Sequence, residues 1–391
     1  ADQLIDIGPL AGKLGGEVVY QGPINDSDTS SITLRHLSER VLMKIPSTGR
    51  RWNHYIEVVG AMQNNLKNIN VRFPLKCLTA VTGVSGSGKS SLVGDILYPA
   101  LYRHIHQLGS KPGLFRGLRG DLGRINAVEY VDQNPIGKST RSNPVTYLKV
   151  YDDIRKLFSE QPYAKMNNYG HSHFSFNIDG GRCPECQGEG VIKIEMQFMA
   201  DVAITCEACG GKRFQPDILE VRFQGKNISD ILSMSVDEAI EFFSAQEDPT
   251  AKRIAEKLQP LSDVGLSYVS LGQSSSTLSG GESQRIKLAS FLGKESSSGS
   301  IMFIFDEPTT GLHFQDIEKL LQSFDALIEK GHSVVVVEHN LDIIRRADWI
   351  IDLGPDAGDK GGELVFEGTP EMLALHPELP TGAALAGEFR N

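Results

Sequence analysis

The residues that could do chemistry begin with a glycine-rich stretch that ends in lysine and serine, Gly83-Val84-Ser85-Gly86-Ser87-Gly88-Lys89-Ser90. It follows the apolar run Leu78–Val81 and precedes a helical pattern over Ser90–Leu97, the strand–loop–helix order of a phosphate-binding loop. Glycines let the backbone wrap around phosphate oxygens, and the N–H groups at the helix start face the anion. We expect Lys89 to reach the β- and γ-phosphates of ATP and the Ser90 hydroxyl to bind Mg²⁺. The predicted nucleotide contacts are Gly83, Ser85, Gly86, Ser87, Gly88, Lys89, Ser90 and Ser91.

Two acids stand at the end of a second apolar run, Ile301–Phe305. Asp306 is expected to hold Mg²⁺ through water, and Glu307 to polarise the attacking water. A strand that ends in Asp-Glu is common, so this pair gains weight from its position downstream of the phosphate loop. Two more residues at strand ends fit the same site only by context, Gln133 and His339. The sequence therefore predicts a catalytic set of Lys89, Glu307 and His339.

A further anion site is predicted at Leu278-Ser279-Gly280-Gly281-Glu282. The Ser279 hydroxyl and the N–H groups of Gly280 and Gly281, at the start of a helix, could face a phosphate. A plain helix N-cap, with Glu282 closing a capping box, explains the same residues, and both interpretations can hold together. The position just before the Asp-Glu strand favours a functional role.

Four of the five cysteines form two Cys-x-x-Cys pairs separated by 19 residues: Cys183, Cys186, Cys206 and Cys209. This spacing is typical of four thiolates around a tetrahedral Zn²⁺, and reduced thiols without metal are the alternative. Such a closed site is structural, because a catalytic zinc needs an open position. Residues 191–198, between the pairs, alternate apolar and polar side chains and predict a β-hairpin. The fifth cysteine, Cys77, is expected to be a buried, inert thiol.

The composition describes an ordinary globular chain of 391 residues, with 40% hydrophobic and 23% charged residues. No apolar run approaches the ~18 residues that span a bilayer, so we expect a cytoplasmic protein without a membrane partner. The net charge of −10 argues against a uniformly basic DNA-coating protein.

An internal repeat organises the chain. Residues 1–22 and 347–368 are identical at 13 of 22 positions without a gap, so each copy is read as the end of one of two homologous modules. We predict the tail of a preceding ATPase module at 1–23, a linker at 24–50, an ATP-binding domain at 51–135 and 276–391, and an insertion at 136–275 that holds the zinc module 183–209. Strands and helices alternate from residue 301, which predicts an α/β fold with a parallel sheet.

The order of the motifs resembles the ABC ATPase superfamily over nearly the whole chain. That resemblance implies an ABC-type P-loop ATPase module with a mixed or parallel sheet and a large α+β insertion. It also implies composite sites, in which the phosphate loop of one module faces the Ser-Gly-Gly signature of another across bound ATP. The 146 residues from Gln133 to Ser279 exceed what transporter ATPases place there.

Longer phrases resemble the C-terminal half of the UvrA family of bacterial nucleotide excision repair: GVSGSGKSSL at 83–92, CPECQGEG at 183–190, CEACGGKRF at 206–214, LGQSSSTLSGGESQRIKLA at 271–289, DEPTTGLH at 306–313 and EHNLDII at 338–344. The resemblance implies a dimeric ATPase that recognises damaged duplex DNA, with ATP, Mg²⁺ and Zn²⁺ as cofactors. Its partners would be the missing N-terminal module, a second copy and other excision-repair subunits. As an isolated half the chain should hydrolyse ATP slowly.

The basic residues that could contact DNA phosphates are Lys138, Arg141, Lys212 and Arg213, although each could equally be a solvated surface charge. A UvrA-like protein that gives resistance to DNA-binding drugs fits the same motifs. A transporter ATPase would need a membrane partner and no zinc, and a chromosome-maintenance ATPase would show heptads in residues 134–278, which have none. A zinc-stabilised interaction module with a dead ATP site conflicts with the intact catalytic set.

Overall fold

The computed structural model describes residues 2–9, 12, 15–24, 31–39, 49–137, 141–194, 202–293 and 299–389. The chain forms two compact units, each assembled from two separate stretches of sequence. The sheet unit comprises residues 43–134 and 294–391, and the cysteine unit comprises residues 1–42 and 135–293. Among the described residues, no helix is both long enough and apolar enough to cross a membrane.

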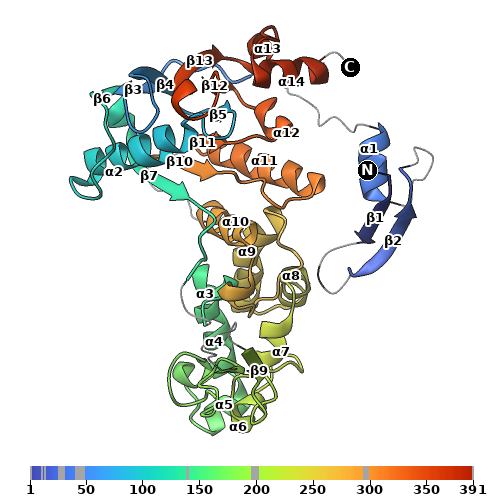
Figure 1. Cartoon of the computed structure of the whole chain (residues 1–391). Helices are drawn as coiled ribbons and strands as arrows, with labels where there is room; N and C mark the ends of the chain where they lie inside the picture. Colours follow the sequence, from blue (N-terminus) through green and yellow to red (C-terminus); the bar gives the residue numbers. More distant parts are fainter. Residues whose placement is uncertain are drawn as a thin grey trace. The chain divides into compact units, whose positions relative to one another are not determined.

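The sheet unit is built on six strands in the order β13-β12-β5-β11-β10-β7 (Figure 1). Every neighbouring pair is parallel except β12–β13. This mixed, largely parallel sheet confirms the α/β fold predicted from the alternation of strands and helices. The strands are β5 (Leu78–Gly83), β7 (Ile125–Val131), β10 (Ser300–Asp306), β11 (Ser333–Val337), β12 (Trp349–Gly354) and β13 (Glu363–Gly368).

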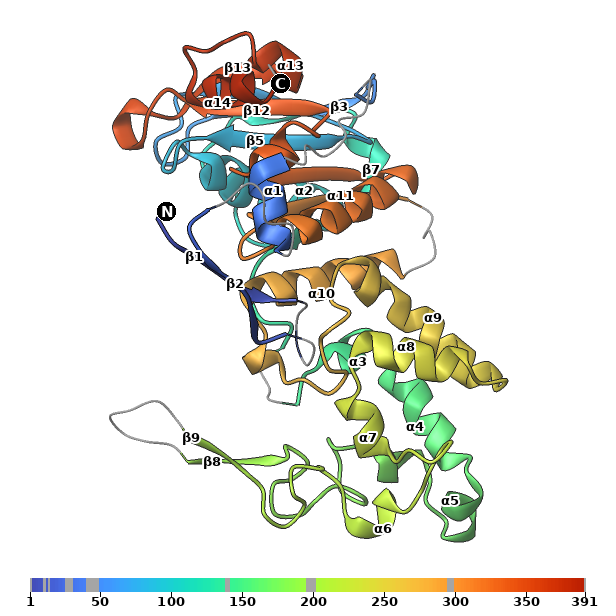
Figure 2. The same cartoon turned by 90° about the vertical axis from the view of Figure 1, so that its right-hand side faces the viewer.

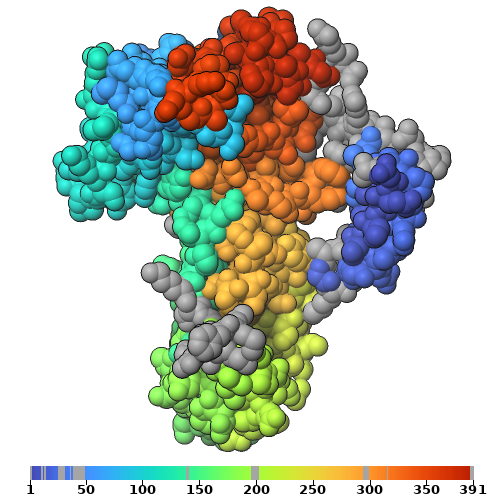
Figure 3. Space-filling view, viewed as in Figure 1, coloured from blue at the N-terminus to red at the C-terminus, as the bar shows by residue number. Residues whose placement is uncertain are grey.

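A smaller antiparallel sheet in the order β4-β3-β6 belongs to the same unit. Its strands are β3 (Tyr55–Ala61), β4 (Ile69–Pro74) and β6 (Gly117–Gly120). The helical elements of the unit are η2 (Ser91–Leu97), α2 (Tyr98–His106), η3 (Leu122–Arg124), α11 (Phe314–Glu329), α12 (Leu341–Ile344), η6 (Gly358–Lys360), α13 (Pro370–Leu373) and α14 (Pro380–Phe389). In the space-filling view, the blue-to-cyan stretch from 55 and the orange-to-red stretch from 300 form one continuous body (Figure 3).

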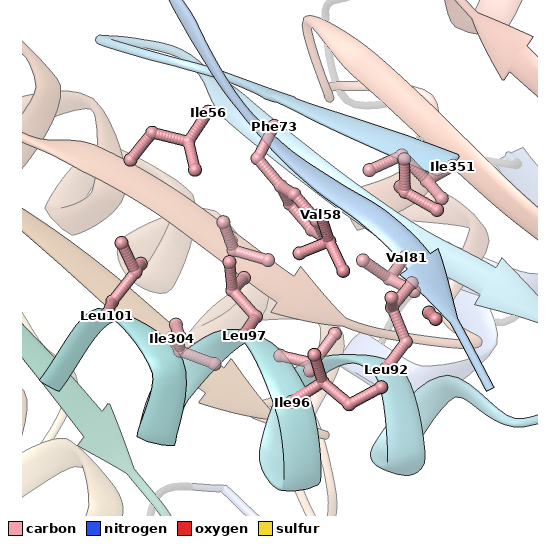
Figure 4. Close-up of a cluster of buried hydrophobic side chains, with 14 of the residues drawn as sticks. Ile56, Val58, Phe73, Val81, Leu92, Ile96, Leu97, Leu101, Ile304 and Ile351 are labelled. Carbon is pink, nitrogen blue, oxygen red and sulfur yellow. The ribbon is translucent and has the colours of Figure 1, made fainter. Parts of the chain in front are cut away.

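One apolar cluster joins the two sheets and the helix that follows the glycine-rich loop (Figure 4). Side chains of the small sheet meet those of η2 and α2 and of strands β5, β10 and β12. The labelled members are Ile56, Val58, Phe73, Val81, Leu92, Ile96, Leu97, Leu101, Ile304 and Ile351, all fully or almost fully buried. Each buried side chain of this size contributes about 1.5–3 kcal/mol, so the cluster fixes the loop's helix against the sheet.

The cysteine unit is mostly helical (Figure 2). Its helical elements are α1 (Ile32–Glu39), α3 (Pro144–Tyr147), α4 (Tyr151–Ser159), α5 (Pro162–Met166), η4 (His171–Phe174), α6 (Pro216–Leu219), α7 (Ile228–Ser233), α8 (Val236–Ser244), α9 (Pro249–Asp263), η5 (Ser275–Thr277) and α10 (Gly280–Leu292). Residues 245–248 separate α8 from α9. The Asp248 carboxylate accepts from the N–H groups of Thr250 and Ala251, and Pro249 stands at the first helical position, so a new helix starts there.

The internal repeat is also a structural repeat. Strands β1 (Leu4–Gly8) and β2 (Glu17–Gly22) pair antiparallel, as β12 and β13 do. Each pair carries a bulge at the equivalent position, after Asp6 in one copy and after Asp352 in the other. Helix α1 lies within the range predicted as a linker, and the Ser31 hydroxyl accepts from the Leu34 N–H at its start.

Candidate functional site

The carboxyl ends of the parallel strands meet at one edge of the large sheet. Asp306 on β10 pairs with Val337 on β11, which in turn pairs with Val81 on β5. The loop that begins at Gly83, the acids at the end of β10 and the histidine after β11 therefore start side by side. In an open parallel sheet, ligands bind at this edge.

The glycine-rich loop requires glycine at two positions, where neighbouring atoms come close and φ is positive. Gly83 has φ +128°, and a Cβ there would lie 2.0 Å from the Leu353 carbonyl oxygen. Gly88 has φ +106°, and its Cβ would lie 2.8 Å from a methyl carbon of Leu66. A side chain at Gly83 would collide with the backbone, and at both positions the positive φ strains any residue that has a Cβ. The loop follows β5 and leads into η2, so the predicted strand–loop–helix order is confirmed.

Lys89 is folded back over this loop. Its ammonium donates to the carbonyl oxygens of Gly83 (3.0 Å) and Val84 (2.9 Å). Burial lowers the pKa of Lys89, while the nearby carboxylates of Glu307, Asp352 and Asp306 act in the opposite direction. The ammonium is therefore held at the loop's centre, where it can exchange carbonyl partners for phosphate oxygens.

The remaining loop residues differ in exposure. Ser85, Gly86 and Ser90 are exposed, whereas Ser87 is buried and its hydroxyl has no hydrogen-bond partner within the described residues. Ser91 accepts a 2.8 Å hydrogen bond from the Asn64 side chain. The exposed Ser90 is the residue directly before η2.

Asp306 and Glu307 occupy contrasting settings. The Tyr130 hydroxyl donates to the Asp306 carboxylate at 3.0 Å, and burial raises the pKa of Asp306. Glu307 has φ +45°, a conformation that costs energy for any residue with a side chain. Its amide donates to the Val337 carbonyl at 2.9 Å, which holds the turn, and its carboxylate is half exposed.

Two strand-end residues predicted by context contact Glu307. The Gln133 amide donates to the Glu307 carbonyl oxygen at 3.3 Å. The His339 Nε2 atom lies 4.0 Å from the Glu307 Oε1 atom. Gln133 and His339, which follow β7 and β11, thus lie beside the Glu307 turn at the end of β10.

Ser279, Gly280 and Gly281 lie in the cysteine unit, at the start of α10. Ser279 is its N-cap, and its hydroxyl accepts from the Glu282 amide at 3.2 Å, while the Glu282 carboxylate accepts from the Ser279 amide at 2.8 Å. The capping box foreseen for these residues is confirmed. The Tyr268 hydroxyl donates to the same carboxylate at 2.6 Å, so the helix start is fixed from two sides.

The four cysteines converge on one point. All four sulfurs lie within 4.8 Å of one another, and the Sγ–Sγ distance is 3.9 Å between Cys183 and Cys206 and 3.7 Å between Cys186 and Cys209. Four thiolates with Zn–S bonds of ~2.3 Å stand roughly 3.8 Å apart at the corners of a tetrahedron. The Gly190 N–H also donates to the Cys186 sulfur at 3.2 Å, as amides do toward thiolate ligands. The donor set and its size fit zinc.

A short hairpin leaves this centre. Strands β8 (Val191–Ile194) and β9 (Val202–Thr205) pair antiparallel (Figure 2), which confirms the predicted hairpin for the described strands; residues 195–201 lie outside the described part. The pairs Ile192–Ile204 and Ile194–Val202 share one face, because opposite and alternate residues point the same way. All four side chains are exposed, by 42% to 49%.

The four basic residues named for DNA differ in their surroundings. Lys138 lies outside the described residues. The Arg141 Nε atom is 3.8 Å from the Glu189 carboxylate, and Lys212 is exposed. The Arg213 guanidinium donates to the Gly272 carbonyl at 2.9 Å and lies over the Phe176 ring, 5.6 Å from its centroid. Burial lowers the pKa of Arg213. Packing on the ring therefore holds this side chain, as well as its charge.

Sequence reasoning missed three residues beside the site. Tyr130 carries the donor to Asp306, and the Asn65 side chain donates to the carbonyl oxygens of Gly86 and Gly358 at 3.0 Å each. Asp352, fully buried, accepts from the hydroxyls of Thr82 and Thr381. A lone acid inside the apolar run at 349–354 was a usable signal for Asp352, whereas Tyr130 and Asn65 depend on contacts between distant segments.

These features define a nucleotide-binding module of the ABC type. Its largely parallel sheet has the phosphate loop, the acidic strand end and the histidine strand end on one edge. The module is joined to a unit with a four-cysteine centre.

No family model matches the chain. It is 49% identical over 388 residues to "UvrABC system protein A" of Clostridium perfringens and 50% identical over 388 residues to the protein of that name from Bacillus subtilis. These alignments cover 98% of this chain, and 41% and 40% of those proteins.

A solved structure shows the same fold. The crystal structure of UvrA2 from Deinococcus radiodurans matches 99% of this chain and 46% of that chain, with a TM-score of 0.90 and 43% identity. The chain belongs to the UvrA family. It spans about two fifths of the length of the curated relatives it matches.

Proposed function

We propose that this chain binds and hydrolyses ATP as part of a DNA-damage recognition subunit of nucleotide excision repair. The proposal rests on the meeting of Lys89, Asp306, Glu307, Gln133 and His339 at one edge of the sheet. The chain that carries them is 50% identical to a protein named UvrABC system protein A. The loop would receive the phosphates on its N–H groups and on the Lys89 ammonium.

The geometry supports the catalytic roles that we propose. The Glu307 carboxylate is half exposed and stands beside His339, so it can accept a hydrogen bond from a water aimed at the γ-phosphate. His339 can donate to a γ-phosphate oxygen from the neighbouring strand end. Gln133, bonded to the Glu307 backbone, links the same turn to the end of β7. Mg²⁺, held by the Ser90 hydroxyl and through water by Asp306, would neutralise phosphate charge.

The four-cysteine centre has a structural role in this proposal. Cys183, Cys186, Cys206 and Cys209 would hold Zn²⁺ and fix the base of the β8–β9 hairpin, because a closed thiolate site leaves no open position for substrate. The hairpin and the exposed Lys212 then form a surface that can approach duplex DNA, where apolar side chains meet bases and a lysine meets phosphates.

The rest of the assembly is proposed from the same observations. The tandem repeat supports a preceding ATPase module, with β1 and β2 as its last strands. The Ser279–Gly281 signature would complete an ATP site on another module, and a second copy of the chain and other excision-repair subunits are the remaining partners. Such a protein would work on DNA in the cytoplasm.

The proposal is tested by DNA binding with and without a lesion, at two stated salt concentrations, with and without ATP. We expect tighter binding to the damaged duplex, a response to ATP, and an affinity that falls with salt because phosphate contacts release counterions. Lys89→Ala is the matched variant that should lose the ATP response alone. If the chain binds ATP but shows no lesion preference in any condition, the damage-recognition role is wrong.

A further inference from the structure

One buried carboxylate has a role that the motifs do not assign. Glu338, the first residue after β11, is 2% exposed and accepts four hydrogen bonds. Its Oε1 atom accepts from the Thr309 amide at 2.9 Å and from the Thr309 hydroxyl at 2.7 Å. Its Oε2 atom accepts from the amides of His339 at 2.9 Å and Asn340 at 3.0 Å. Each oxygen thus serves a different segment of chain.

The two segments are the turns that carry the catalytic side chains. Thr309 follows Glu307 in the turn after β10, and His339 begins the turn after the neighbouring parallel strand β11. The Thr310 amide donates back to the Glu307 carbonyl at 3.2 Å, so Thr309 belongs to a closed turn that starts at Glu307. The Glu338 carboxylate therefore bridges the Glu307 turn and the His339 turn.

The bridge also explains how an unfavourable backbone is kept in place. Glu307 holds a left-handed φ of +45°, which persists only where the surroundings over-determine it. On one side, the Glu307 amide donates a hydrogen bond to the Val337 carbonyl. On the other side, the Thr309 amide donates a hydrogen bond to the Glu338 carboxylate. Both anchors lie on the chain that leads into His339, so the two turns are fixed relative to each other.

Only a glutamate supplies this set of acceptors. Four donors need four lone-pair sites on two oxygens, which an ionised carboxylate has. A glutamine of the same size would present an NH₂ group to one of the donor pairs, and would leave those buried donors unpaired. An aspartate is one methylene shorter and could not reach both turns.

We infer that Glu338 is a positioning residue for ATP hydrolysis, which sets the 4.0 Å separation between His339 and Glu307 by bridging their turns. The inference rests on the proposed ATPase function. It predicts that loss of the bridge harms the chemical step and spares nucleotide binding, because the phosphate loop and Lys89 make no contact with this carboxylate among the interactions described.

The test compares Glu338→Gln with a matched buried acid elsewhere in the same sheet. Asp348 is 6% exposed and accepts from the amides of Arg50 and Leu78 at the opposite end of β5, so Asp348→Asn is the control. We expect Glu338→Gln to lower kcat about 10- to 100-fold, the order that a small misplacement of reacting groups costs. KM for ATP should stay within about twofold, since binding of the ground state is unchanged. Asp348→Asn should keep kcat.

Thr309 provides the second arm. Thr309→Val removes the hydroxyl donor and keeps the shape and the amide, so it should lower kcat in the same direction by less than Glu338→Gln. Thr309→Ser keeps the hydroxyl and should retain activity. Equal kcat in Glu338→Gln and wild type, or equal losses in Glu338→Gln and Asp348→Asn, would overturn the inference.

A readout without catalysis separates this inference from the proposed function. Amide hydrogen exchange in Glu338→Gln should lose protection at Thr309 and at Asn340 together, because one carboxylate holds both amides. Loss confined to residues 338–340 would refute the bridge even if ATP is hydrolysed. Conversely, coupled loss in a protein that hydrolyses no ATP would leave the bridge intact and refute the ATPase role.

Discussion

The imidazole of His339 stands 4.0 Å from the carboxylate of Glu307, and the two residues come from the ends of adjacent parallel strands. In the proposed mechanism, His339 would donate to the γ-phosphate and Glu307 would accept a hydrogen bond from the attacking water. The arrangement follows from the register of β10 and β11, in which Asp306 pairs with Val337.

Glu307→Gln keeps the side chain's size and removes its basicity, so we expect ATP binding to persist while kcat falls by about 100-fold or more. Steady-state phosphate release and equilibrium ATP binding measure the two effects separately. Glu329→Gln, an exposed acid at the end of α11, is the control and should behave as wild type. An unchanged kcat in Glu307→Gln would remove this residue from the mechanism.

Cys206→Ser should release the zinc that we propose at the four-cysteine centre. The Cys206 side chain is fully buried, and its sulfur lies 3.9 Å from the sulfur of Cys183 in the other pair, so the substitution removes one of the four thiolates that join the two pairs. We expect the bound zinc to fall from about one equivalent to none, with DNA binding lost and ATP affinity retained. Elemental analysis of the purified protein checks the first point. Normal DNA binding by a metal-free preparation contradicts the role given to the centre.

The exposed face of the β8–β9 hairpin gives a separate prediction. Replacing Ile192 and Ile194 by serine together should reduce the preference for damaged over intact duplex while ATP affinity is unchanged, because these side chains are open to a partner. Lys193→Ser, on the opposite face of the same strand, is the matched control. If the double variant keeps the full lesion preference in a competition assay, the hairpin face takes no part in recognition.

Asp352 predicts a pH dependence of stability. Burial raises the pKa of Asp352 above its ordinary value, and hydrogen bonds from Thr82 and Thr381 only partly offset this. The folded state then holds the proton more tightly than the unfolded state, so this residue's contribution to the free energy of unfolding declines as pH rises from about 4 through the folded-state pKa, and is constant above it.

Asp352→Asn keeps the oxygen that both hydroxyls contact and has no charge to bury. The Tm of Asp352→Asn relative to wild type should therefore rise across that pH window and then level off. Calorimetry on both proteins between about pH 4 and 8 measures the difference. A Tm difference that does not vary with pH would show that the carboxyl has equal pKa values in both states.

Short sequence patterns predicted those parts of the site that lie within one continuous stretch of the chain. The phosphate loop, the acidic strand end and the cysteine pairs each occupy a short stretch whose spacing demands one geometry. Cys77, expected to be a buried thiol, is fully buried, and burial raises its pKa to about 12. The hairpin strands and the capping box at Ser279 were likewise predictable, because each is formed by residues close together in the sequence.

Contacts between segments that are distant in the sequence could not be predicted from short sequence patterns. The Tyr130 hydroxyl reaches Asp306 only because β7 and β10 are neighbours in the sheet, and strand order is a property of the whole fold. Arg213 carries a charge that suggested an exposed phosphate contact, but packing on Phe176 and a bond to Gly272 depend on segments far along the chain. Charge alone does not tell which long side chain a fold covers.

Calorimetric titration of Mg-ATP into wild type and Lys89→Ala tests whether the loop around Lys89 binds ATP. Lys89 is 6% exposed and its ammonium sits on the carbonyls of Gly83 and Val84, where it can reach phosphate oxygens. We expect saturable binding to wild type and a loss of about 10-fold or more in affinity for the variant, since a hydrogen bond to a charged group is worth about 1.5–3 kcal/mol. Equal ATP affinity in the two proteins would contradict it.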